Sequence, residues 1–156
     1  ARMIVCDIKS NELIPLEISR KVSHYAWANN DEILCTVFNE NQQCGYFMYS
    51  VSKYTCRAIR PDILTRDGHP SFIDDNTIIT DTYPDKWGFQ ELIIADLNGG
   101  GETTVARFYS IPVKEAERRT DLHPRLSPDK GSVCVDVNSH GVRDLVILDM
   151  EKPTGR

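Results

Sequence analysis

The chain has 156 residues, of which 40% are hydrophobic and 26% are charged, and its formal net charge is −5 at pH 7. These proportions are typical of a globular protein large enough to bury a core. The acidic balance argues against duplex nucleic acid as a partner, because such proteins need a basic surface to replace phosphate counterions. No apolar run approaches the roughly 20 residues that cross a bilayer, so we expect no membrane span.

Short runs rich in Val, Ile, Thr and aromatic residues predict strands throughout, because Gly, Pro, Asn and Asp clusters separate them. Residues 1–20 contain two runs, at 3–8 and 13–18. Residues 21–62 contain four, at 24–27, 33–38, 45–51 and 55–60. Residues 66–112 contain four, which start at 69, 77, 90 and 103. Residues 120–156 contain three, at 123–126, 132–137 and 144–149. The one segment that resembles a helix is a short surface piece at 113–119.

These groups of strands repeat one another. His69-Pro70 and His123-Pro124 each open a strand, and each is followed by an acidic turn and a second apolar strand that ends in Asp81 or Asp136. A weaker copy opens at His24. Repeats of roughly 40 to 50 residues with strand-like contents are typical of propeller blades. The sequence therefore predicts an all-β protein made of β-propeller blades, each with four antiparallel strands.

The number of blades predicts an incomplete ring. Residues 1–20 match the third and fourth strands of a blade, 21–62 and 66–112 are whole blades, and 120–156 lack the last strand. We expect the whole chain, 1–156, to be one partial propeller domain of about three blades, whereas known propellers use about four to eight. Because exposed strand edges invite pairing, we expect the ends to pair with missing blades or with another chain.

The repeat places one histidine and one aspartate of each blade on the same face. In an antiparallel meander the start of the first strand lies beside the end of the second, so we expect His69 near Asp81 and His123 near Asp136. His24 occupies the matching position of the preceding blade. Imidazole and carboxylate groups suit a divalent transition metal such as manganese. The same pairs could instead hold neighbouring blades together, and both interpretations stay open.

Loops on this face supply further candidates. His140 lies outside the repeated position, and we expect it to complete a metal site with His69 and His123. Trp87 lies in a turn-rich loop, where its ring could stack on a sugar or cap the blade. The residues expected to contact a substrate are His69, Asp81, Trp87, His123, Asp136, His140 and Arg143.

Three segments resemble the oligogalacturonate lyase and TolB-like propellers: HPSF at 69–72, TDTYPD at 80–85, and HPRLSPD at 123–129 followed by HGVR at 140–143. The resemblance implies a seven-bladed propeller. It also implies a metal, held by His and Gln near the channel, that acidifies the proton beside a uronate carboxylate before β-elimination. The Gln followed closely by two His that this metal site would require does not occur in this chain.

We therefore expect a carbohydrate-associated β-propeller that binds an acidic or neutral saccharide at its histidine-rich channel face. Two alternatives are a metal-dependent oligogalacturonate lyase and a non-catalytic, TolB-like propeller that binds proteins. The expected partners are an oligosaccharide or a small polar ligand, with no nucleic acid.

The number and spacing of the cysteines indicate whether the chain suits a reducing or an oxidising cellular compartment. There are five, at positions 6, 35, 44, 56 and 134, with no C-x-x-C pair among them. No zinc or thioredoxin-type spacing results. An odd number of cysteines leans toward a reducing compartment, which slightly favours the cytoplasm over the periplasm.

Overall fold

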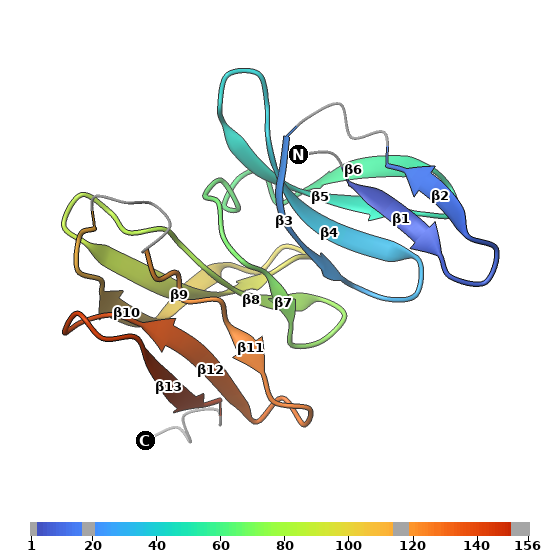
Figure 1. The fold of residues 1–156 in the computed structure, drawn as a ribbon. Coiled ribbons are helices and arrows are strands. Elements are labelled where there is room, and N and C mark those ends of the chain that lie inside the picture. The colour runs from blue at the N-terminus through green and yellow to red at the C-terminus, as the bar shows by residue number, and fades with distance from the viewer. Residues whose placement is uncertain (1–2, 17–20, 114–118, 151–156) are drawn as a thin grey trace.

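A computed structural model describes residues 3–16, 21–113 and 119–150. Its thirteen strands form four sheets that follow one another in chain order (Figure 1). Within the described residues every strand pairing is antiparallel, and no helix has the length and hydropathy that would cross a membrane. The prediction of an all-β chain with blade-like sheets in an incomplete ring is confirmed.

Each sheet is an up-and-down meander. The first contains β1 (Ile4–Asp7) and β2 (Glu12–Pro15). The second contains β3 (Lys21–Trp27), β4 (Glu32–Phe38), β5 (Cys44–Ser50) and β6 (Thr55–Ile59). The third contains β7 (Ser71–Phe72), β8 (Thr77–Asp81), β9 (Phe89–Asp96) and β10 (Glu102–Tyr109). The fourth contains β11 (Arg125–Leu126), β12 (Ser132–Val137) and β13 (Asp144–Asp149).

The inner strands are apolar on both faces because a sheet packs on each side of them. Ile78 and Ile79 are neighbours in β8, and both are 0% exposed. Successive side chains of a strand point to opposite faces, so Ile78 packs with Leu34 of the second sheet and Ile79 packs with Val133 of the fourth. Each sheet therefore shares a core with the sheet that follows it along the chain.

The innermost strands of the third and fourth sheets are shorter than the sequence predicted, whereas β3 begins three residues before the expected His24. The two shorter strands were expected to begin at His69 and His123, but β7 begins at Ser71 and β11 at Arg125. The backbone N–H groups of both histidines donate to the carboxylate of Asp81 rather than to a neighbouring strand, and His123 has a φ of 44°. Most of the helix expected at 113–119 lies outside the described residues.

Candidate functional site

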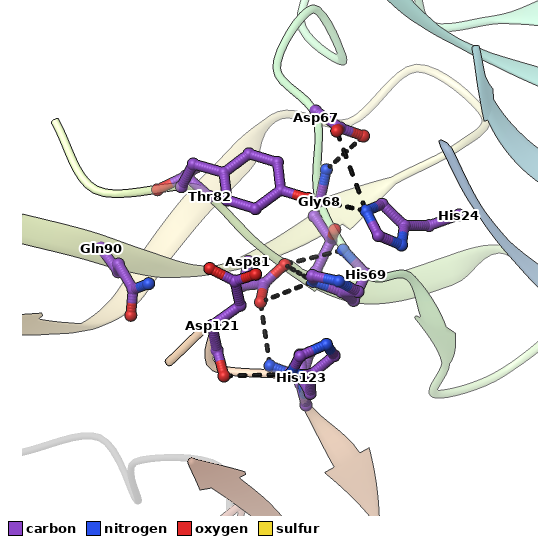
Figure 2. A network of polar contacts seen from close by, with 12 residues as sticks. His24, Asp67, Gly68, His69, Asp81, Thr82, Gln90, Asp121 and His123 are labelled. Atoms are coloured by element: carbon purple, nitrogen blue, oxygen red, sulfur yellow. Dashed lines mark hydrogen bonds and ion pairs between the residues drawn. The ribbon is translucent and has the colours of Figure 1, made fainter. Parts of the chain in front are cut away.

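Three histidines from three consecutive sheets stack on one another (Figure 2). His24 lies on β3, and His69 and His123 lie just before β7 and β11. The ring centroids of His24 and His69 are 3.8 Å apart, and those of His69 and His123 are 3.9 Å apart. We call these three residues the histidine column. It joins the inner edges of three sheets.

Asp81 holds the column together from the end of β8. Its carboxylate accepts the backbone N–H of His69 at 2.7 Å and that of His123 at 2.9 Å. Nδ1 of His69 lies 2.9 Å and 3.0 Å from the two carboxylate oxygens. The Asp81 side chain is only 1% exposed. A buried carboxylate needs such donors to offset its lost hydration, and here they come from two sheets.

The hydrogen bonds of the column define the tautomers of two of its rings. Nδ1 of His69 faces the Asp81 carboxylate, and Nδ1 of His123 lies 3.0 Å from the backbone carbonyl oxygen of Asp121. Both partners only accept, so each Nδ1 carries the hydrogen. In the neutral rings Nε2 then carries a lone pair. The two imidazoles thus offer acceptor nitrogens to a hydroxyl group or to a metal ion.

His24 is held differently from the other two histidines. Its Nε2 lies 2.8 Å from the Tyr83 hydroxyl and 3.8 Å from Oδ2 of Asp67. Burial lowers the pKa of His24, and the neighbouring His69 acts in the same direction, whereas Asp67 opposes them. The ring is therefore neutral at pH 7.

Tyr83 and Arg119 form the side of the site next to His24. Burial, reinforced by the charges of Asp67 and Asp121, raises the pKa of Tyr83 to about 12, so its hydroxyl stays protonated. The Arg119 guanidinium lies 4.3 Å from the centroid of the Tyr83 ring. Arg119 also binds both carboxylate oxygens of Asp121, at 2.6 Å and 3.0 Å.

Asp136 lies at the end of β12, where the sequence predicted a contact with His123. Nδ1 of His123 is 3.9 Å from Oδ2 of Asp136, but the closer donors are Arg125 at 3.0 Å and Arg143 at 2.9 Å. The Asp136 side chain is 2% exposed. Burial opposes its ionisation, but the guanidiniums of Arg143 and Arg125 outweigh burial and hold the pKa of this carboxyl below its usual range.

The remaining predicted residues lie in exposed loops. Trp87 is 68% exposed between β8 and β9, with Nζ of Lys86 at 5.0 Å from its ring centroid. His140 is exposed between β12 and β13. The structure thus gathers His69, His123, Asp81 and Asp136, and it does not place Trp87 or His140 against the column.

A divalent transition metal fits two residues of the column, His69 and His123, together with Asp121. Among the described residues, the ligand atoms of His69, Asp121 and His123 lie within 4.8 Å of one another. Metal-binding histidines usually donate their other N–H to a carboxylate or a backbone carbonyl, as His69 and His123 do here. His140, the third histidine expected to bind the metal, is not part of this group, and metal binding by all of them stays a prediction.

A cleft of about 870 Å³ runs outward between the second and third sheets. Asp67 and Tyr83, which contact His24, also line this cleft, so it opens beside the histidine column. The cleft has aromatic and polar walls, formed in part by Phe38, Gln43, Phe47, Arg66, Tyr83 and Phe89. Clefts of this size and lining are typical of small-molecule sites.

A close backbone approach fixes the segment that carries His69. A Cβ atom at Gly68 would overlap the backbone carbonyl oxygen of Asp81. Glycine alone lets the segment pass close enough to β8 for the His69 N–H to reach the Asp81 carboxylate. Gly68 is therefore a positioning residue for the site.

The sequence interpretation missed two acidic residues of the site. Asp67 and Asp121 each lie two positions before a column histidine, in Asp67-Gly68-His69 and Asp121-Leu122-His123. This repeated Asp-x-His motif is visible in the sequence and could have identified both aspartates as candidates. It places the Asp121 carboxylate near His69 and His123, whereas the Asp67 carboxylate lies near His24 of the preceding sheet.

The structure resembles two solved propellers. The crystal structure of TolB from Acinetobacter baumannii matches 97% of this chain with a TM-score of 0.75 and 15% sequence identity. An oligogalacturonate lyase in complex with manganese matches 96% of the chain with a TM-score of 0.72 and 15% identity. The fold is that of a β-propeller.

The chain covers less than half of each of these two structures, and its sequence identity to both is low. This propeller chain spans 35% of the TolB chain and 41% of the lyase chain. No family model matches the sequence, and no curated protein sequence matches it. At 15% identity the likeness establishes the fold, and the function must be argued from the site.

Proposed function

We propose that this propeller binds a saccharide, acidic or neutral, at the histidine column and along the cleft that opens beside it. The observation that carries the proposal is the pair of Nδ1 hydrogen bonds of His69 and His123. They leave one acceptor nitrogen on each of two rings whose centroids are 3.9 Å apart, and sugar hydroxyl groups are suitable donors. Binding sites for small polar ligands usually combine a few such polar groups with aromatic walls.

The cleft supplies the complementary surface. Aromatic side chains such as Phe47 and Phe89 offer apolar area for the C–H face of a sugar ring. Arg119 lies over the Tyr83 ring near the column and could pair with the carboxylate of a uronic acid. This arrangement supports both the neutral and the acidic ligand of the proposal.

A second candidate is a metal-dependent lyase that acts on oligogalacturonate. The grouping of His69, Asp121 and His123 favours it, and one structural neighbour is such a lyase in complex with manganese. When bound, a divalent ion would act as a Lewis acid on a uronate carboxylate. A third possibility, a TolB-like propeller that binds proteins, rests on the fold alone.

The test is a His123→Ala variant, measured for glycan binding and for stability. The hydrogen bond that joins His123 to the third sheet uses its backbone N–H, which alanine retains. We expect affinity for a galacturonate or neutral oligosaccharide to fall at least tenfold, about 1.4 kcal/mol, with little change in melting temperature. Loss of stability by roughly 1 to 3 kcal/mol without a binding defect would instead assign the ring a structural role.

Two comparisons sharpen this test. His69→Ala removes a ring that binds the buried Asp81, so we expect it to lower stability as well as binding. Titration with Mn²⁺ in the absence of sugar tests the metal directly. Asp121→Asn should weaken Mn²⁺ binding if the lyase candidate is correct, whereas glycan binding that is unchanged in EDTA would contradict it.

A further inference from the structure

Asp67 lies at the inner end of the cleft between the second and third sheets, and its side chain is 8% exposed. Its Oδ2 accepts the hydroxyl of Ser23 at 2.8 Å, and its Oδ1 accepts the backbone N–H of Gly68 at 3.1 Å. Nε2 of His24 is 3.8 Å from Oδ2, beyond hydrogen-bond range, and lies instead 2.8 Å from the Tyr83 hydroxyl (Figure 2). Two neutral donors therefore serve a carboxylate that can accept about four hydrogen bonds.

A buried carboxylate in this state favours a positively charged partner. Removing such a group from water is costly unless charged or well-placed donors replace its hydration. In the part of the chain that the structure describes, Asp67 forms no ion pair with a Lys or Arg side chain. The cleft reaches this carboxylate, because Asp67 is one of its lining residues. A ligand that enters the cleft can therefore supply the missing cation.

The guanidiniums beside the cleft, in contrast, are already bound to carboxylates. Arg66 binds Glu91 at 2.7 Å and Glu102 at 3.0 Å. Arg107 lies 3.4 Å from Glu91 and 3.5 Å from Asp85. The carboxylate of a uronic acid would have to displace these partners to pair with either arginine.

The balance of charge around the cleft is negative. The charged residues of its lining are three carboxylates and one guanidinium: Asp67, Asp85, Glu91 and Arg66. With the bound Arg107 and Glu102, four carboxylates stand against two guanidiniums, which leaves a net charge of −2. Lys21, whose Nζ lies 5.7 Å from the Phe38 ring centroid, reduces this excess without reversing it. Next to the column, Arg119 is neutralised by Asp121, which binds it through both carboxylate oxygens. The cleft therefore favours a cationic group over an anionic one.

We propose that the inner end of the cleft binds the ammonium group of an amino sugar through the carboxylate of Asp67. The ammonium donates to the Asp67 oxygens, and the C–H face of the sugar lies along the aromatic wall that includes Phe47. This inference rests on the saccharide binding proposed above. It narrows the ligand to an otherwise neutral saccharide that carries a free amino group, and it disfavours uronates.

The test compares ligands that differ only in charge. The affinity of the wild-type protein is measured for three oligosaccharides of the same linkage and length, built from glucosamine, glucose or glucuronic acid, and for the corresponding galacto set. In at least one set we expect the amine-bearing ligand to bind about tenfold more tightly than the neutral one. We expect the uronate to bind about tenfold more weakly than the neutral ligand.

Two variants assign the preference to Asp67. Asp67→Asn removes the charge and keeps a carbonyl oxygen for the Ser23 hydroxyl. The ratio of the amine affinity to the neutral affinity should then fall from about ten to about one. Asp75→Asn removes the same charge from an exposed turn outside the cleft, and it should keep the ratio of the wild type.

The outcomes separate this inference from the proposed function. Saccharide binding without a preference for the amine, or a preference that Asp67→Asn retains, would overturn the inference and leave the proposed function standing. If no saccharide of either set binds to the wild type, the proposed function is contradicted and the inference fails with it. If Asp67→Asn does not fold, the wild-type comparison of the three ligands decides alone.

Discussion

Asp81 is the residue on which two sheets depend. Its buried carboxylate accepts donors from His69 in the third sheet and from His123 at the start of the fourth. A side chain that satisfies groups from two elements couples their stability. The histidine column is thus positioned by one buried carboxylate at the end of β8.

Replacing Asp81 by Ala should therefore be strongly destabilising. The change leaves the part-buried backbone N–H groups of His69 and His123 and the Nδ1 of His69 without their acceptor, and we expect a loss of about 3 to 5 kcal/mol in the free energy of unfolding. Urea denaturation measures it. Asp75→Ala, in the exposed turn before β8, is the control and should change stability by less than about 0.5 kcal/mol. A loss below about 1 kcal/mol for Asp81→Ala would show that these hydrogen bonds contribute little energy.

At the scale of the element, the turns depend on ionised aspartates. Asp85 accepts the backbone N–H groups of Phe89 and Trp87, and Asp96 accepts that of Asn98. These hydrogen bonds favour the charged form and hold the pKa of each carboxyl below its usual value. The stability of these turns therefore depends on pH, because protonation of Asp85 or Asp96 weakens the hydrogen bonds.

The sign of the pH effect follows from linkage. A folded-state pKa below that of the unfolded chain gives stability that is present at neutral pH and is lost as pH falls through the usual value of 3.8 toward the folded value. We expect the melting temperature to drop below about pH 4. Asp85→Asn keeps an acceptor without a titrating group, so its curve should be flatter than that of the wild type. Identical slopes in the two curves would contradict the assignment.

The turn before β9 needs a glycine at position 88, and this requirement can be tested by substitution. Gly88 has a φ of 84°, and an added Cβ would lie 2.9 Å from Cε2 of Tyr109. Gly88→Ala should cost about 1 to 3 kcal/mol, because the backbone conformation and the contact are both unfavourable. Gly101→Ala, where a Cβ meets nothing within 4 Å, is the control. Unfolding in urea that is equal for both variants would show that the turn relaxes freely.

Most strands could be predicted because their patterns are local. The run at 77–81 coincides with β8, and 132–137 coincides with β12. The predicted innermost strands of the third and fourth sheets were too long, because the backbone N–H groups of His69 and His123 bond to a carboxylate distant in sequence. No local pattern reveals that competition.

The candidate site was predictable only where topology fixes it. The meander brings the start of one strand beside the end of the next, which predicted His69 near Asp81. Arg119 and Arg125 were missed because their long side chains can reach several acceptors, so strand pairing does not determine which carboxylate each one binds. His140 was chosen because it lies outside the repeated position, beside Gly141 and Arg143, and it is not in the group formed by His69, Asp121 and His123.

At the scale of the whole molecule, residues 1–156 present two apolar end faces. One face lies on β13 of the fourth sheet, where Leu145 is 66% exposed and Ile147 is 73% exposed. The other lies on β1 and β2, where Ile4 is 57% exposed and Leu13 is 64% exposed. Repeat arrays with uncovered terminal faces are marginally stable and prone to associate. The expectation that the ends pair with other blades or with another chain stays a prediction.

Sedimentation velocity of residues 1–156 at several concentrations tests this expectation. We expect concentration-dependent association in the micromolar range. The double change Ile4→Lys and Leu13→Lys places two charges on the first end face and should reduce association without lowering the melting temperature. Val105→Lys on β10 adds a charge away from both faces and should have no effect. A monomer at all concentrations would count against the prediction.

The order of the interfaces also has a consequence for synthesis. Asp81 and His123 are separated by 42 residues, which a ribosome adds in about 2 to 8 s at roughly 5 to 20 residues per second. During that interval the third sheet can form while Ile79, Leu92 and the Asp81 carboxylate lack their cover. Each blade that emerges then shields the one before it, so the growing end of the nascent chain exposes one new face at a time, in addition to the face on β1 and β2.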